Sequence, residues 1–334
     1  MNEDPESTPG DPVPAADTPA PAGSGPEIPV ATAQAYSWPA PQEPLAKMQS
    51  PEFPAFDGLQ SIPAPPPPPS RLIPNIGHFF VFLGLLVPAA IGGYIVALGS
   101  LLAAQPHVNF RVLMARMAHS VLYAISFQAA IYVVLWGLTV LVFSLWWGGF
   151  WKGIHWNGAV ARRRFLLLAA MGVATGLLIT IAGNFVPMPK APPILEDLTR
   201  SRLGAWFLMG FGVTLAPLTE ELAFRGFLLP SFINIFRWFE RQRKIGESVV
   251  NALGIPLSIV LTSVPFALMH SEQVANSWGP VLLIGLVSVV LCIVRLSMKS
   301  LASSILVHSF YNLTLFTGLL IQTDGFRHLD KLKG

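Results

Sequence analysis

Apolar residues dominate the chain from Ile76 onward, in seven runs separated by short polar connections. Each run can supply the roughly 20 apolar residues that a helix needs to cross the hydrocarbon core of a bilayer. The pattern therefore predicts an all-α, polytopic membrane protein with seven transmembrane helices, or eight as the alternative. The predicted spans are 76–103, 118–147, 164–186, 202–236, 249–270, 278–296 and 300–321.

The fourth run is the source of that alternative. It covers 35 residues, more than one crossing requires, and Pro217 lies inside it. Proline interrupts the hydrogen bonding of a helix, so this run can form a tilted span followed by an amphipathic helix that ends at Phe236.

Composition and charge exclude an ordinary soluble domain. The chain is 52% hydrophobic and 12% charged, whereas soluble domains carry roughly 25% charged residues. Residues 1–70 contain nine acidic residues and Lys47 as their one basic residue, which leaves twenty basic residues against nine acids in the remainder. A basic, apolar body fits a lipid bilayer with anionic headgroups, and we expect no nucleic-acid partner.

The N-terminal part differs from the rest of the chain. Residues 1–71 hold nineteen of the 31 prolines and few residues that could build a core, so we predict a disordered, acidic tail. We divide the chain into this tail, N-terminal transmembrane helices at 72–199, a transmembrane core at 200–321 and a short polar C-terminal tail at 322–334. The single cysteine, Cys292, excludes an internal disulfide and a cysteine-based zinc cluster.

Two basic connections predict the orientation in the membrane. Cytoplasmic connections are enriched in lysine and arginine, so with seven spans the N-terminal tail is cytoplasmic, and we expect the plasma (inner) membrane. The connections contain Lys152, Arg162, Arg163 and Arg164, and Arg237, Arg241, Arg243 and Lys244.

Ionisable side chains inside the apolar runs mark the candidate site, because such groups are costly in hydrocarbon and mostly pair or act chemically. Glu221 and Arg225 are four residues apart, on one helical face, where they can form an ion pair. Glu220 points about 100° away from Glu221 and has no local cation, which makes it the better candidate base. The alternative is that the cluster only holds helices together.

Two further polar pairs lie on other spans. Phe266 and His270 share a helical face at the end of the fifth run, where a histidine can simply mark the membrane interface. His308 and Asn312 share a face in the middle of the seventh run, where their polar atoms need partners from other helices. These two residues could equally serve as interhelical hydrogen bonds.

Taken together, the three clusters supply a carboxylate base and polar donors. Amide hydrolysis needs a base that activates water and donors that hold the developing oxyanion. The sequence lacks the H-E-x-x-H zinc helix, the G-x-S-x-G serine elbow and the G-x-G-D aspartyl motif of other membrane proteases.

The ordered motifs resemble one known family. E-E-x-x-x-R at 220–225, F-x-x-x-H at 266–270 and H-x-x-x-N at 308–312 are similar to the motifs of the CAAX-processing and bacteriocin-processing intramembrane proteases, also called the Abi group, which include the Ras-converting endopeptidase. The resemblance covers about residues 200–320.

The resemblance implies a role for each residue. Glu220 and His270 would activate the attacking water, Glu221 and Arg225 would organise the site with Phe266 packed beside it, and His308 and Asn312 would stabilise the oxyanion. Family members are often described as zinc-dependent, and a metal-free glutamate mechanism fits the same residues. We therefore expect either a zinc ion or no cofactor; the candidate zinc ligands, on separate helices, are Glu220, His270 and His308.

We accordingly predict an intramembrane endopeptidase that hydrolyses a peptide bond of a membrane-associated peptide or protein, such as a prenylated CAAX-type substrate. The alternative is a non-catalytic membrane scaffold or bacteriocin-immunity protein with the same fold. An isosteric Glu220→Gln change separates the two, because it abolishes catalysis and leaves a binding function nearly unchanged.

Overall fold

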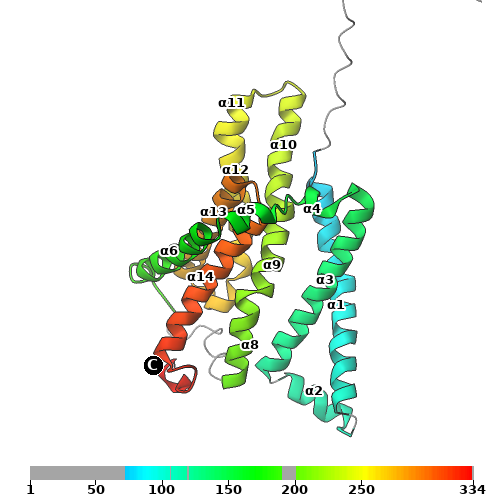
Figure 1. Ribbon diagram of the computed structural model, residues 1–334, viewed down its shortest axis with the longest axis vertical. Helices are drawn as coiled ribbons and strands as arrows, with labels where there is room; N and C mark the ends of the chain where they lie inside the picture. The colour runs from blue at the N-terminus through cyan, green and yellow to red at the C-terminus, as the bar shows by residue number, and fades with distance from the viewer. Residues whose placement is uncertain (1–71, 106, 119, 190–200, 333–334) are drawn as a thin grey trace, which may run out of the picture. The chain divides into compact units, whose positions relative to one another are not determined.

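The computed structural model describes residues 72–105, 107–118, 120–189 and 201–332, which form helices and no strands (Figure 1). Seven helical runs in these ranges are long and apolar enough to cross a membrane, which confirms the all-α, multi-pass membrane fold. The tail predicted at 1–71 lies outside the described residues. The spans are α1 (Ile76–Ala104), α3 (Val121–Trp147), α6 (Phe165–Gly183), Arg202–Arg241, Glu247–Met269, α13 (Trp278–Met298) and α14 (Leu301–Gln322).

Shorter helices, which the hydrophobic pattern does not predict, lie between the spans and after the last one. The fifth span itself consists of α11, a π-helical turn η2 and α12. The bounds are α2 (Phe110–Ala118), α4 (Phe150–Gly153), α5 (Gly158–Arg163), α11 (Glu247–Val249), η2 (Val250–Gly254), α12 (Ile255–Met269), η3 (Glu272–Val274) and η4 (Leu329–Leu332).

Two prolines shape the fourth span, which runs to Arg241, five residues beyond the predicted end. Its parts are α8 (Arg202–Val213), α9 (Leu215–Glu221), the π-helix η1 (Leu222–Leu228) and α10 (Leu229–Arg241). α8 ends four residues before Pro217, because a proline ring clashes with the carbonyl four residues earlier. The π-helical register of η1 ends where Pro230 opens α10. The segment that carries Glu220, Glu221 and Arg225 therefore lies between two proline-dependent irregularities.

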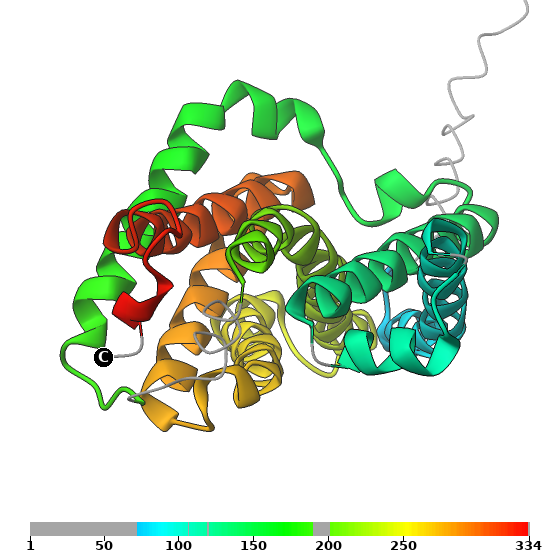
Figure 2. The ribbon, with the colours of Figure 1, turned by 90° about the horizontal axis from the view of Figure 1, so that it is seen from below.

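Glycines allow close packing on both sides of this fourth span. Figure 2 shows the α1–α3 pair on one side of α8 and the α6–α14 pair on the other. A Cβ atom on Gly172 of α6 would lie 2.5 Å from the Val307 carbonyl oxygen of α14, and one on Gly176 would lie 2.8 Å from Thr314. This small-xxx-small pattern brings α6 against the helix that carries His308. On α1, a Cβ on Gly93 would lie 2.6 Å from the Ile131 backbone of α3.

Large apolar side chains are exposed along the outer spans. Examples are Ile91 and Ile95 on α1, Leu145 on α3, and Leu166 and Leu178 on α6. The lipid tails of a bilayer cover such surfaces without the cost that water would impose. The buried polar side chains of the fourth to seventh spans, such as Glu221, Arg225 and His308, instead lie in the interior, where protein groups must satisfy them.

The C-terminal segment contributes to packing. The residues after α14, predicted as a short polar tail, include Phe326, which is buried in a cluster with Ala205 of α8 and stacks edge-on against Trp206. The end of the described chain is thereby attached to the start of the fourth span.

Candidate active site

Glu220 faces two imidazoles that come from different spans. Its Oε2 atom lies 3.7 Å from Nε2 of His270, which follows α12, and 3.8 Å from Nε2 of His308 on α14. The side chains of Glu220 and His270 are 14% and 15% exposed. Both distances exceed a hydrogen bond, so these polar edges face one another without direct bonding. We call Glu220, His270 and the Nε2 edge of His308 the reactive face.

Glu221, the next residue, is in the opposite environment. Its side chain is completely buried, and Oε1 lies 2.8 Å from Nη1 of Arg225 and 3.0 Å from Nδ1 of His308. The first contact is the ion pair that the four-residue spacing predicts. A carboxylate with a cation and a second donor at these distances can remain charged in an apolar interior.

Arg225 is completely buried and joins Glu221 to the sixth span. Its Nη2 atom donates to the carbonyl oxygen and the Oγ of Ser288 on α13, at 3.0 and 2.7 Å. The guanidinium lies 4.5 Å from the centre of the Phe266 ring, within the range of a cation–π interaction. Phe266 thus packs beneath the cation. We call Glu221, Arg225 and Ser288 the buried clamp.

Hydrogen bonds fix the orientation of both imidazoles. Nδ1 of His308 contacts a carboxylate, and Nδ1 of His270 contacts the Phe266 carbonyl oxygen at 2.8 Å. Because these partners accept hydrogen bonds, the hydrogen of each neutral ring resides on Nδ1. The Nε2 atom of each neutral ring is then an acceptor that faces Glu220, and three acceptors can converge only around a proton or a donor between them.

Asn312 lies one helical turn beyond His308 but contacts a different part of the fourth span. Its Nδ2 atom donates to the carbonyl oxygen of Gly212 at 2.7 Å, at the end of α8 where Pro217 interrupts the helix. The amide has a second hydrogen that this bond does not use. Asn312 therefore ties α14 to the helix break, and its predicted contact with an oxyanion stays a prediction.

Several contacts of this site were not anticipated from the sequence. Trp136 on α3 donates from Nε1 to Thr219 Oγ1 at 3.2 Å, directly beside Glu220 in the chain. Arg295 on α13 is buried and donates to the backbone of Arg225. An arginine inside an apolar run is itself a signal of function, and Arg295 could have been found by that criterion.

Among the described residues, no group of three or more histidine, cysteine, aspartate or glutamate side chains has an arrangement that could hold a metal ion. The zinc ion with Glu220, His270 and His308 as ligands stays a prediction.

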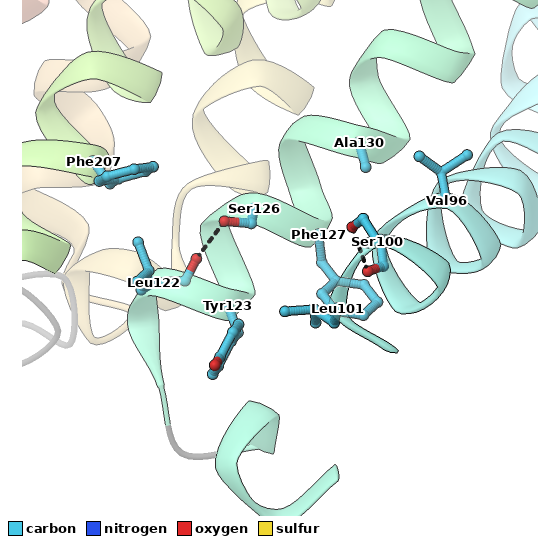
Figure 3. A pocket seen from close by; sticks show the side chains of 10 residues that line it. Val96, Ser100, Leu101, Leu122, Tyr123, Ser126, Phe127, Ala130 and Phe207 are labelled. Atoms are coloured by element: carbon cyan, nitrogen blue, oxygen red, sulfur yellow. Dashed lines mark hydrogen bonds between the residues drawn. The ribbon is translucent and has the colours of Figure 1, made fainter. Parts of the chain in front are cut away.

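An apolar cavity of about 290 Å³ lies between α1, α3 and α8, apart from these residues (Figure 3). Its walls include Val96, Phe127 and Phe207. The Ser100 and Ser126 hydroxyls beside it donate to carbonyls of their own helices. The cavity contains none of the residues of the reactive face, so it is not the candidate active site.

Comparison with known proteins identifies the region that holds the site. Residues 202–314 match the family model described as type II CAAX prenyl endopeptidase Rce1-like. This stretch is similar to that family. The match confirms the resemblance stated from the three motifs, and residues 202–314, which we call the Rce1-like core, contain all of them. No curated protein matches the chain. No solved structure matches it.

Proposed function

We propose that this protein is an intramembrane endopeptidase that cleaves a peptide bond of a membrane-associated, prenylated CAAX-type substrate, with Glu220 as the general base. The observation that supports it best is the placement of Glu220 Oε2 between two imidazole Nε2 atoms, at 3.7 and 3.8 Å, beside a Glu221 whose Oε1 atom is paired with Arg225. A water molecule supplies donors to two of these groups, Glu220 and Nε2 of His270.

In the first step, that water donates one hydrogen bond to Glu220 and the other to Nε2 of His270. Glu220 removes a proton as the water oxygen bonds to the scissile carbonyl carbon, and the carbonyl electron pair moves onto oxygen. The electron pair on that oxygen then re-forms the C=O bond as the C–N bond breaks, and the proton held by Glu220 passes to the leaving amine. A positioned base of this kind contributes roughly 10²- to 10⁴-fold to a rate.

His308 and Asn312 are the proposed oxyanion donors. The Nδ1 hydrogen of His308 is directed at Glu221, so a donor on Nε2 requires a ring that carries a hydrogen on both nitrogens. Asn312 supplies the amide hydrogen that Gly212 does not use. Donors preorganised in this way act where charge develops in the transition state.

The proposed location is the plasma (inner) membrane, with the N-terminal tail on the cytoplasmic side. The chain enters α1 on the same side as the α3–α6 and α10–α11 connections, which hold Arg162, Arg163 and Lys244. The positive-inside rule makes that side cytoplasmic. Digestion of an N-terminal epitope in inside-out vesicles, but not in right-side-out vesicles, is the result that this orientation requires.

The first test is cleavage of a farnesylated CAAX peptide by purified protein in liposomes, measured by mass spectrometry. We expect Glu220→Gln to lower kcat by at least about 100-fold, because the base is lost while the shape is kept. The matched control is Glu247→Gln, which changes an exposed glutamate of α11 and should leave kcat unchanged.

Two outcomes would overturn the proposal. One is equal turnover by wild type and Glu220→Gln. The other is no cleavage by wild type of prenylated or unprenylated membrane peptides, which would favour the non-catalytic scaffold or immunity function. The same assay in the presence of EDTA tests the metal requirement. Loss of turnover in EDTA that added Zn²⁺ restores would show that the protein uses a zinc ion.

A further inference from the structure

The carbonyl of Arg225 has no partner within its own helix. Leu229 donates its N–H to the carbonyl of Phe224, five residues earlier, in the π-helical register of η1. In that register the N–H of residue 230 would donate to the Arg225 carbonyl, but residue 230 is a proline and has no N–H. A buried carbonyl without a donor costs about 1–3 kcal/mol, so this position requires a donor from outside the helix.

Arg295 supplies that donor. It lies in the last turn of α13, is 6% exposed, and its Nε atom donates to the Arg225 carbonyl oxygen at 3.2 Å. Ser288, seven residues earlier on α13, accepts from the Arg225 side chain. The sixth span therefore holds Arg225 at both ends, the backbone through Arg295 and the guanidinium through Ser288.

Arg295 also contacts a loop outside the Rce1-like core. Its Nη2 atom donates to the Ile154 carbonyl oxygen at 3.3 Å. The next carbonyls of this loop, residues 154–157, accept from the start of α14: His155 from Leu301 N–H at 2.9 Å and Trp156 from Ala302 N–H at 3.2 Å. α14 carries His308, so one loop is bonded to Arg295 and to the helix of the second imidazole.

Local geometry directs these carbonyls inward. His155 and Asn157 have positive φ angles of 53° and 35°, in the left-handed region, which reverses the chain so that consecutive carbonyls point toward α13 and α14. Burial and the nearby Arg295 charge lower the pKa of His155, so this imidazole is neutral near pH 7 and adds no second cation.

We propose that Arg295 is a positioning residue for the reactive face. It donates to the Arg225 carbonyl, which lacks a donor in its own helix because residue 230 is a proline. The Arg225 side chain in turn fixes Glu221, and Glu221 fixes the ring of His308. The catalytic part of this inference rests on the proposed endopeptidase function, whereas the hydrogen bond from Arg295 to the carbonyl can be tested without any activity.

The test is a double-mutant cycle of Arg295→Met and Pro230→Ala. The alanine introduced at position 230 restores an N–H that can reach the Arg225 carbonyl at five-residue spacing. Arg163→Met, on the exposed side of α5, is the control for loss of an arginine. Cys292 is the single cysteine, fully buried one turn before Arg295, so its labelling rate with maleimide reports opening at this position.

We expect Arg295→Met to raise the Cys292 labelling rate about tenfold and to lower kcat about tenfold with KM little changed, because an unpaired carbonyl loosens η1. Adding Pro230→Ala should recover most of both losses, and Arg163→Met should change neither. A mere packing role for Arg295 predicts additive effects in the double variant, and additivity would overturn the inference.

Two further outcomes of this test are failure of Arg295→Met to accumulate and inactivity of the wild-type protein. If Arg295→Met does not accumulate as folded protein, recovery of folded protein by Pro230→Ala supports the inference, and failure to recover it contradicts the inference. If wild type and Glu220→Gln are equally inactive, the endopeptidase proposal fails, while the labelling cycle still decides whether Arg295 holds the carbonyl.

Discussion

The reactive face and the buried clamp contain two consecutive glutamates but differ in burial and in the distances between their polar atoms. In the clamp, polar atoms meet at 2.7–3.0 Å, and Glu221 and Arg225 are completely buried. In the reactive face, the gaps around Glu220 are 3.7 and 3.8 Å, and the carboxylate is partly exposed. A helix turns by about 100° per residue, so two consecutive glutamates enter these two environments.

This difference indicates which side chains can take part in a reaction. A carboxylate that already has a cation and a second donor has little reason to take up a proton, so Glu221 is suited to holding its neighbours in place. A carboxylate that faces two acceptors at a distance can engage a water molecule, so Glu220 is suited to proton transfer. His308 belongs to both regions, because Nδ1 contacts the clamp and Nε2 faces Glu220.

The largest effect on stability should come from breaking the clamp. Arg225→Met leaves the buried Glu221 without its cation, and we expect a loss of about 3–5 kcal/mol in the free energy of unfolding. Unfolding by SDS in mixed micelles measures the change. Glu220→Gln, in the reactive face, should unfold like wild type.

The matched control for this substitution is Arg237→Met. Arg237 also pairs with a glutamate of its own helix, Glu240, at 2.9 Å, but both side chains are partly exposed. An exposed pair contributes about 0–1 kcal/mol. Equal effects of the two arginine substitutions would contradict the distinction between the clamp and an ordinary surface pair.

A second prediction decides to which region Asn312 belongs. Asn312→Ala should lower kcat about 10²- to 10³-fold if the amide is an oxyanion donor. Its bond to the Gly212 carbonyl adds a stability loss of only about 1 kcal/mol. Steady-state kinetics and unfolding of the same preparation separate the two effects.

Asn184→Ala is the control for Asn312, because the Asn184 amide also donates to helix carbonyls, those of Thr180 and Ile181. It should leave kcat unchanged. A stability loss in Asn312→Ala with kcat near that of wild type would rule out Asn312 as an oxyanion donor and leave it as a structural contact with α8.

The smallest effect concerns the contact from outside the Rce1-like core. Trp136→Phe removes the Nε1–H donor to Thr219 and keeps most of the ring, so we expect a loss of about 0.5–1.5 kcal/mol in the free energy of unfolding. Trp238→Phe, at an exposed position of α10, is the control. A hundredfold loss of kcat in Trp136→Phe would instead make α3 a part of the reactive face.

The hydrophobic pattern was sufficient for the membrane fold. The predicted spans agree with the seven helical runs to within a few residues at most ends, because the apolar length that a bilayer requires is a property of the chain alone. The motifs were sufficient for the family resemblance, and the four-residue spacing for the Glu221–Arg225 pair. Both are local or compositional signals.

Pairing between distant residues was decided by the tertiary structure. The sequence indicates that Pro217 disturbs the fourth span, but it does not indicate that Asn312 reaches the carbonyl at the resulting break. Nor does the sequence predict a π-helical turn before Pro230 or the donor from Arg295 that accompanies it. Each contact joins residues at least 70 positions apart, and no local period encodes such a distance.

By itself, therefore, the sequence determined that the chain crosses a membrane as helices and which side chains carry the candidate chemistry. Only the tertiary structure decided that Glu220 faces two imidazoles while Glu221 is held in a clamp. The physical reason is that helical geometry fixes the direction of each side chain relative to its own helix, whereas helix packing fixes what that side chain meets.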